Sequence, residues 1–335
     1  MGLSLKPSEL KIVRAIPKAL TYTDIARRAG FSLPYVTAKV RELMAKLEVV
    51  FGVNFEALGL VRTYLLAKCD GKLLDRIREL GRLPYVLEVY RASGCGKENI
   101  FAKLLTPDPS AALEGAPVKA VKTWTSCAAT SWRPDLSPPI VEGREAVVDW
   151  RAFKSIINSE FEFEEQRAPA RLDEKDLVIL REKRKYPFKP LSDIARVLGI
   201  SQQLASYHYR KHVMPLWTYN EVKVRSNGPL VLLEVRLADC YAGFRVMRAL
   251  STIPWLRECI LAACGSRIVA ELAASAKELA ELYEALGEVD CVKEVRLLAW
   301  LHEKVYEDPL PLLEGLREWG WDLSPLREAW RMLTS

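Results

Sequence analysis

Apolar residues at helical spacing predict a short helix near the start of the chain. Residues 10–16 place their apolar side chains on one face, and Pro17 then ends the helix because proline cannot continue it. A second short helix follows, DIARRAG, which Thr23 or Asp24 can cap. Gly30 permits the tight turn after this helix.

A third helix and a ribbon complete this first pattern. Ser32 caps LPYVTAKVRELMAKL, in which Val36, Val40 and Leu43 share one apolar face. The stretch VVFGVNF is β-prone and follows directly. Helix, short helix, glycine turn and capped helix form the order of a helix-turn-helix, and the ribbon predicts a wing.

The same pattern returns in the second half of the chain. DIARRAGFS begins at position 24 and DIARVLGIS at position 193. An apolar helix at 177–180 precedes the second string. After the string, Ser201 caps the helix QQLASYHYRKHV, and the β-prone ribbon is WTYNEVKV. One copy of this pattern is also compatible with an ordinary helical hairpin. Two copies, each followed by a β-prone ribbon, favour two helix-turn-helix motifs.

Each motif is followed by strand and helix patterns in the order β-α-β-β-α-β, which predicts a ferredoxin-like module. The predicted elements of the first module are residues 60–69, 72–80, 85–93, 99–105, 110–116 and 118–126. Those of the second module are residues 230–237, 242–250, 255–263, 267–274, 275–287 and 292–300. We therefore predict an α+β protein of two tandem units, each a winged helix-turn-helix followed by a ferredoxin-like module.

The patterns also predict the boundaries of these parts. A Pro-rich break and an acidic stretch flank one helix in DWRAFKSIINSEF, which indicates a connector. The last segment, rich in Leu and Trp, predicts a helical extension for packing or oligomerisation. The predicted domains are 1–56 and 171–226 (winged helix-turn-helix motifs), 57–132 and 227–302 (ferredoxin-like modules), 133–170 (connector) and 303–335 (C-terminal extension).

Positive charge is concentrated on the two helix-turn-helix segments. Residues 1–50 carry nine lysines and arginines against four acids, and residues 171–225 carry twelve against six. The whole chain has a net charge of +6, so these segments hold +11 and the remainder is net −5. Clustered positive charge is typical of nucleic-acid binding, so we expect double-stranded DNA as the partner.

Other classes of protein are disfavoured by composition. No run of about 18 apolar residues is present, and the N-terminal stretch does not resemble a signal peptide, so we expect a cytoplasmic protein without a membrane partner. The seven cysteines contain no CxxC pair, which favours reduced thiols. Three histidines do not make a zinc site, and no acid–base or nucleophile pair stands out. We expect no metal, no cofactor and no enzymatic activity.

The helix-turn-helix strings resemble the Lrp/AsnC family of bacterial and archaeal transcription regulators. The resemblance lies in TDIARRAGFS, LDEKDLVIL and LSDIARVLGIS, and it covers about two-thirds of the chain. Lys39 and His208 stand where the family usually has Arg, and His212 where it has Leu. The resemblance implies DNA binding, a pseudo-dimer formed by the two halves of one archaeal chain, and a small-molecule effector near the module interface. A further homodimer is compatible with it.

The outward positions of the two third helices are the predicted DNA contacts. Gln202 and Gln203 are the candidates for base recognition, because glutamine can pair bidentately with adenine. The basic residues more often contact phosphates. The full predicted set is Tyr35, Thr37, Lys39, Arg41, Gln202, Gln203, Ser206, His208, Arg210 and Lys211. The basic stretch 181–189 either contacts the DNA backbone or is a solvated loop.

The resemblance also implies effector positions in the turns between the middle strands of the modules. They read SGCGKEN and ACGSR, with Gly94, Gly96 and Gly265 as the candidates. The resembled family tends to have an aspartate here, and neither turn contains one. Cys95 and Cys264 occupy matching places and either pack as small core residues or serve as redox or metal groups. A phosphate-binding P-loop is excluded by the spacing.

Two other functions stay open. Sirohaem decarboxylases resemble this architecture, and the resemblance implies histidine and arginine in the ferredoxin-like module. Here His302 is predicted to lie past the last strand, and the other two histidines lie on the second recognition helix. The second open function is that of a non-catalytic adaptor of the transcription machinery, since winged helices and ferredoxin-like sheets also bind proteins.

Overall fold

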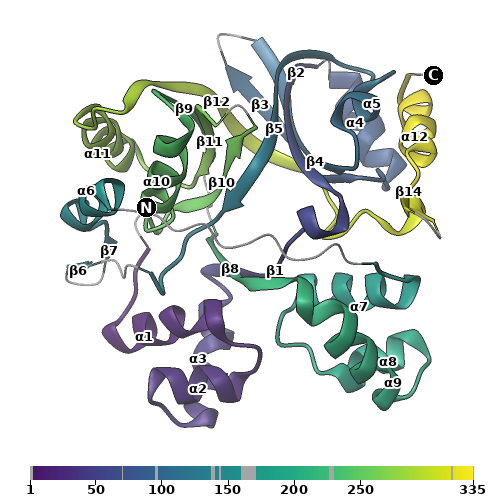
Figure 1. Cartoon of the computed structure of the whole chain (residues 1–335), viewed down its shortest axis with the longest axis horizontal. Coiled ribbons are helices and arrows are strands. Elements are labelled where there is room, and N and C mark those ends of the chain that lie inside the picture. The colour runs from purple at the N-terminus through teal and green to yellow at the C-terminus, as the bar shows by residue number, and fades with distance from the viewer. Residues whose placement is uncertain are drawn as a thin grey trace. The chain divides into compact units, whose positions relative to one another are not determined.

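The computed structural model describes residues 3–69, 71–94, 97–136, 140–142, 145–159, 171–225, 230–263, 265–317 and 320–334. In each half, three helices and a strand precede a β-α-β-β-α-β series (Figure 1). The fold is α+β, with two tandem copies of a winged helix-turn-helix and a ferredoxin-like module. This confirms the predicted fold class.

The first helix-turn-helix follows the predicted order. Its elements are α1 (Pro7–Ala15), α2 (Tyr22–Ala29), α3 (Leu33–Leu43) and the wing strand β1 (Leu47–Val53). Gly30 ends α2 with a left-handed φ of 74°. The cap differs from the prediction: Thr21, two residues earlier than expected, accepts a hydrogen bond from the backbone of Asp24. Its extended backbone lets the hydroxyl reach back over the first turn.

The second helix-turn-helix repeats this order with one change. Its elements are α7 (Glu174–Lys185), α8 (Leu191–Leu198), α9 (Gln202–His208), a π-helical turn (Tyr209–Val213), a 3₁₀ turn (Met214–Leu216) and the wing strand β8 (Trp217–Val224). Gly199 has a φ of 65°, and the Ser201 hydroxyl caps α9. The predicted recognition helix is therefore an α-helix that widens into a π turn at its end.

The first ferredoxin-like module is an antiparallel sheet with two helices. Its elements are β2 (Val61–Lys68), α4 (Gly71–Leu80), β3 (Val86–Gly94), β4 (Lys97–Thr106), α5 (Pro109–Leu113) and β5 (Lys119–Thr130). Strand β4 pairs with β2 and β3, and β2 also pairs with β5. Strand partners far apart in the sequence make this the split order of a ferredoxin-like sheet.

The second module has the same element order. Its elements are β9 (Leu230–Leu237), α10 (Cys240–Leu250), β10 (Leu256–Ala262), β11 (Arg267–Leu272), α11 (Ala276–Gly287) and β12 (Val292–Glu307). Strand β11 pairs with β9 and β10, and β10 also pairs with Ser126 to Thr130 of β5. The sequence predicted that the last strand ends at residue 300, but β12 continues to Glu307.

The connector and the C-terminal segment are built from short elements. The connector contains β6 (Ile140–Glu142), β7 (Glu145–Val147) and α6 (Trp150–Asn158), so its predicted helix is confirmed. The predicted helical extension is wrong except at its end. It consists of a 3₁₀ turn (Leu313–Gly315), β13 (Leu316–Arg317), β14 (Gly320–Trp321) and α12 (Ser324–Thr334). Pro309 and Pro311 precede this region and disfavour a continuous helix.

The chain divides into two compact units that cross the two sequence halves. The first unit contains residues 1–50, 126–164 and 219–300, and the second contains residues 51–125, 165–218 and 301–335. The first helix-turn-helix therefore belongs to the same unit as the second module. The second helix-turn-helix belongs with the first module.

Each unit has its own apolar core. In the first unit, Phe153 and Ile157 of α6 join a buried cluster with α10 and the strands β9 to β11. In the second unit, the indole of Trp330 on α12 donates a hydrogen bond to Ala112 at the end of α5. Among the described residues, no helix is both long enough and apolar enough to cross a bilayer.

Candidate functional site

The exposed side of α9 carries most of the predicted contacts of the second recognition helix. Gln202, Gln203 and Arg210 are exposed. An open groove of about 710 Å³ lies along this side, and it is lined by Gln202, Gln203, Ser206, Tyr207, Arg210 and Lys211. The Lys211 ammonium donates a hydrogen bond to the Tyr207 hydroxyl at 2.8 Å. The groove thus combines amide, hydroxyl and cationic groups on one helix.

The equivalent side of α3 is more occupied by internal contacts. The Tyr35 hydroxyl donates to Ser8, and Thr37 donates to the carbonyl of Leu33 one turn earlier. Lys39 forms an ion pair with Glu42. Arg41 is exposed. Of the two cations predicted on α3, Lys39 is thus held in an ion pair, whereas Arg41 forms none with the residues that the structure describes.

A second basic groove lies on the first helix-turn-helix, away from its recognition helix. It has a volume of about 390 Å³ and is lined by Lys11, Arg14, Ala15, Lys18, Arg28, Ala29 and Asp135. Asp135 is itself paired with Arg133 at 2.9 Å and lies 3.5 Å from Lys18. The sequence analysis did not single out these four basic residues as a site. It showed only that residues 1–50 carry an excess of positive charge.

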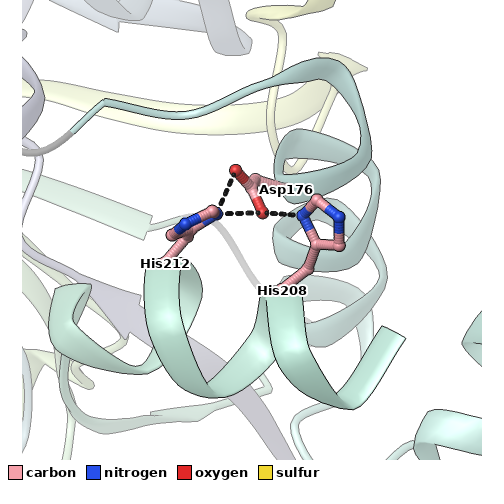
Figure 2. A group of neighbouring side chains, drawn as sticks. All are labelled: Asp176, His208 and His212. Carbon is pink, nitrogen blue, oxygen red and sulfur yellow. Dashed lines mark hydrogen bonds and ion pairs between the residues drawn. The ribbon is translucent and has the colours of Figure 1, made fainter. Parts of the chain in front are cut away.

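Beneath α9, two histidines meet one aspartate. The Nδ1 atom of His208 lies 2.8 Å from Oδ1 of Asp176, and Nδ1 of His212 lies 2.9 Å from Oδ2 (Figure 2). His208 is only 8% exposed and Asp176 only 1% exposed. The prediction that His208 faces outward is wrong, because its ring turns toward α7. The sequence analysis did not predict this cluster, because it considered the three histidines without a carboxylate partner.

Two features of the sequence place these groups together. Asp176 is the third residue of α7 and forms a capping box with Asp173: each carboxylate accepts a hydrogen bond from the other residue's backbone, at 2.8 and 3.0 Å. His208 and His212 are four residues apart, which places them on one side of a helix. The capping box thus holds the carboxylate in the position that both imidazoles face.

One side of the sheet of the second unit carries polar and aromatic side chains, of which Tyr64, Tyr90 and Lys103 are buried. Tyr64 and Glu88 are each paired with Lys103 across the strands, so the three side chains point to the same side. Lys103 lies 2.8 Å from Glu88, and Lys304 of β12 lies 2.7 Å from the same carboxylate. Lys304 also lies 5.5 Å from the ring of Tyr90. Lys304 also lies 3.1 Å from a second carboxylate, that of Glu307, so the two ammonium groups are paired with two carboxylates.

His302 lies at the end of this face. The sequence predicted that it lies past the last strand, and this is wrong because β12 continues to Glu307. His302 and Lys304 are two residues apart on the strand and so share a side. The His302 Nε2 atom lies 2.6 Å from the Ser93 hydroxyl of β3, and the imidazole is exposed.

The predicted effector glycines are only partly described. Gly94 is the last residue of β3, while Gly96, Cys95 and Cys264 lie outside the described residues. Gly265 has a φ of 69°, and a Cβ at this position would lie 2.2 Å from that of Cys240. Gly265 therefore has a packing role, because it allows the turn to approach the start of α10 closely.

The sequence matches no protein-family model and no curated protein. Solved structures are similar in fold. The crystal structure of the siroheme decarboxylase NirDL covers 98% of this chain and is itself covered to 98%, with a TM-score of 0.52 and 11% identity. E. coli AsnC covers 40% of this chain and is covered to 94%, with a TM-score of 0.32 and 14% identity. A Pyrococcus furiosus regulatory protein of the AsnC family covers 44% and is covered to 100%, with a TM-score of 0.30 and 16% identity.

The match along both full chains shows that the tandem fold of this protein is shared with a known decarboxylase. Identity at this level demonstrates the fold alone.

Proposed function

We propose that the chain is a tetrapyrrole-modifying enzyme of the siroheme-decarboxylase type. The observation that carries this proposal is the position of His302 on β12, beside Ser93 and on the same side of the strand as Lys304. The absence of a histidine from the modules was the main argument against such an enzyme. That argument no longer applies, and the full-length likeness in fold supports the proposal.

Siroheme carries several carboxylate side chains, and its decarboxylation has two chemical needs. The bond between a side-chain carbon and its carboxylate breaks, carbon dioxide leaves, and the electron pair left on the carbon takes up a proton. The protein must therefore hold carboxylates by positive charge and supply a proton donor. His302 is the candidate donor because histidine is the side chain that most often transfers protons in enzymes.

The neighbouring residues have separate roles in this proposal. Lys304 supplies positive charge for a substrate carboxylate, which would compete with Glu88 and Glu307 for its ammonium group. The Ser93 hydroxyl orients the imidazole through its bond to Nε2. Lys304 has a side chain that is 25% exposed and is the cation nearer to solvent, whereas that of Lys103 is 4% exposed.

Decarboxylation is tested with purified protein and siroheme under anaerobic conditions, with products identified by mass spectrometry. We expect loss of carbon dioxide from the substrate, and a turnover number lowered by about a hundredfold in His302→Asn, because a general acid contributes at least this much. Lys304→Met should raise the substrate concentration needed for half-maximal rate.

The matched control is Lys277→Met, which replaces an exposed lysine on α11 that belongs to the first unit and is paired with Glu281. It should change neither constant. A protein that does not alter the absorption spectrum of added siroheme would contradict the proposal.

DNA binding is the second candidate function, and the groove along α9 is the observation that favours it. Gln202 and Gln203 are exposed side by side, with Arg210 and Lys211 further along the same helix. This arrangement suits base contacts at the start of the helix and phosphate contacts beyond it. The basic groove of the first helix-turn-helix would add phosphate contacts.

A selection from a random duplex pool at several salt concentrations tests this second function. If it is right, an enriched motif appears, Gln203→Ala removes the preference at one base pair, and Lys211→Ala lowers the salt slope by about one. Retention of duplexes without any motif would indicate non-specific attraction to the basic surface. No retention at low salt would eliminate the DNA candidate and leave the enzyme proposal untouched.

A further inference from the structure

We propose that Asp176, His208 and His212, completed by Asp173, form a zinc site that fastens the second recognition helix to α7. The ligand atoms of Asp176 and the two histidines all lie within 4.8 Å of one another. All four residues belong to the second unit. The proposal is independent of both candidate functions, because it concerns how this helix-turn-helix is held together.

The distances suit a metal ion after a small adjustment. Two ligands of a tetrahedral zinc ion, each about 2.1 Å from it, lie about 3.4 Å apart. The Nδ1 atoms of His208 and His212 lie 2.8 and 2.9 Å from the nearest oxygen of Asp176. The groups need to separate by about half an ångström for zinc to replace the shared hydrogen bonds.

Asp173 supplies the fourth ligand. Its Oδ2 atom lies 3.7 Å from Nδ1 of His208, while its other oxygen caps the backbone of Asp176. One carboxylate can therefore serve both as helix cap and as ligand. The resulting set of two imidazoles and two carboxylates is one that zinc accepts, whereas calcium and magnesium prefer all-oxygen sites.

The helix that carries the two histidines contains a π-helical turn. The π-helical turn begins at Tyr209, directly after His208, and includes His212. A π turn is wider than an α turn, and such turns are frequent at functional sites. This local distortion is therefore a second observation that favours a binding site at the two imidazoles. Their ring centroids lie 5.5 Å apart with nearly perpendicular planes, and Figure 2 shows both rings directed at Asp176.

Burial is graded across the cluster. The side chain of Asp176 is 1% exposed, that of His208 is 10% exposed and that of His212 is 29% exposed. Water is thus kept from the carboxylate, which strengthens its attraction for a cation. A metal ion can enter from the side of His212. The backbone bond from Asp173 to Asp176 holds the carboxylate in place, as second-layer contacts do in zinc proteins.

The test uses the full chain after dialysis against a chelator, titrated with Zn²⁺ and, separately, with Co²⁺. We expect one equivalent of zinc per chain, a raised melting temperature, and Co²⁺ absorption bands of the intensity typical of four-coordinate sites. Asp176→Asn and His212→Gln should each weaken zinc binding at least tenfold. His302→Gln is the matched control and should bind zinc as the wild type does.

Asp173→Asn separates the metal role from a folding role. Asparagine is as good a helix cap as aspartate, so α7 is preserved while one negative ligand is lost. We expect this variant to fold with an unchanged circular dichroism spectrum and to bind zinc more weakly. Wild-type protein whose melting temperature and metal content do not respond to Zn²⁺ would overturn the proposal. So would equal zinc affinity in the wild type, Asp173→Asn and His212→Gln.

Discussion

At the scale of single residues, the basic stretch 181–189 has a role that neither of its two interpretations anticipated. Lys183 and Arg184 are buried, at 5% and 8% exposure. The guanidinium of Arg184 donates to the carbonyls of Phe51 and Pro309, and Arg181 pairs with Asp308 at 2.9 Å. These charges hold α7 to neighbouring segments of the second unit. A charge count could not distinguish them from charges that face DNA.

Because Lys183 is buried, we expect the free energy of unfolding to depend on pH. Burial lowers the pKa of its ammonium from 10.5 to about 8, although Nζ donates to the carbonyls of Pro187 and Lys189. Between pH 8 and pH 10.5 the unfolded chain keeps a proton that the folded chain has lost. The contribution of Lys183 to the free energy of unfolding therefore rises with pH across this window, by on the order of 3 kcal/mol.

Urea unfolding of the wild type and of Lys183→Met, followed at several pH values, measures this contribution. Methionine cannot titrate, so the difference in unfolding free energy between the two proteins should shift in favour of the wild type as pH rises. Because other groups titrate equally in both proteins, the difference isolates one side chain. Parallel pH profiles would show that Lys183 keeps its proton.

At the scale of elements, the repeated string DIA-x-x-x-G-x-S reflects the same turn in both halves. Gly30 and Gly199 occupy it with φ values of 74° and 65°, and both end a helix in the left-handed conformation. The following serine, Ser32 or Ser201, is the N-cap of the recognition helix. A local requirement of the backbone therefore explains why these letters recur.

Replacing these glycines with alanine should destabilise the protein through backbone strain alone. A Cβ at Gly30 or Gly199 would have no atom within 4 Å, so no clash arises. The expected loss is about 1 kcal/mol for each of Gly30→Ala and Gly199→Ala, measured by chemical unfolding. Gly287→Ala is the control, because this glycine lies in α11 without a left-handed φ and has equal space. It should leave stability unchanged or raise it. Equal effects at all three positions would contradict the explanation.

At the scale of the whole molecule, the compact units do not follow the order of the halves. Asn220, on the second wing strand β8, is fully buried, and its amide donates to the carbonyls of Ile16 and Ala19 in the first helix-turn-helix. Arg257 of the second module likewise pairs with Glu48 of the first wing at 3.1 Å. The first unit is thus assembled from both halves of the sequence.

The sequence by itself determined the elements and their repetition. Helical and strand periods, glycine turns and serine caps are local requirements, so residues near one another in the chain reveal them. This is why the fold class and nearly all elements were predicted, including the helix of the connector. The errors arose where packing overrides local preference, as in the length of β12 and the irregular C-terminal segment.

Only the tertiary structure decided which side chains meet. Asp176 lies 32 residues before His208, and Ser93 lies 209 residues before His302. His208 lies three residues after the buried Ala205, so it belongs to the inward side of α9, and only the packing against α7 shows that Asp176 lies opposite it. Both candidate sites depend on contacts between distant segments, and these follow from how the helices and strands pack.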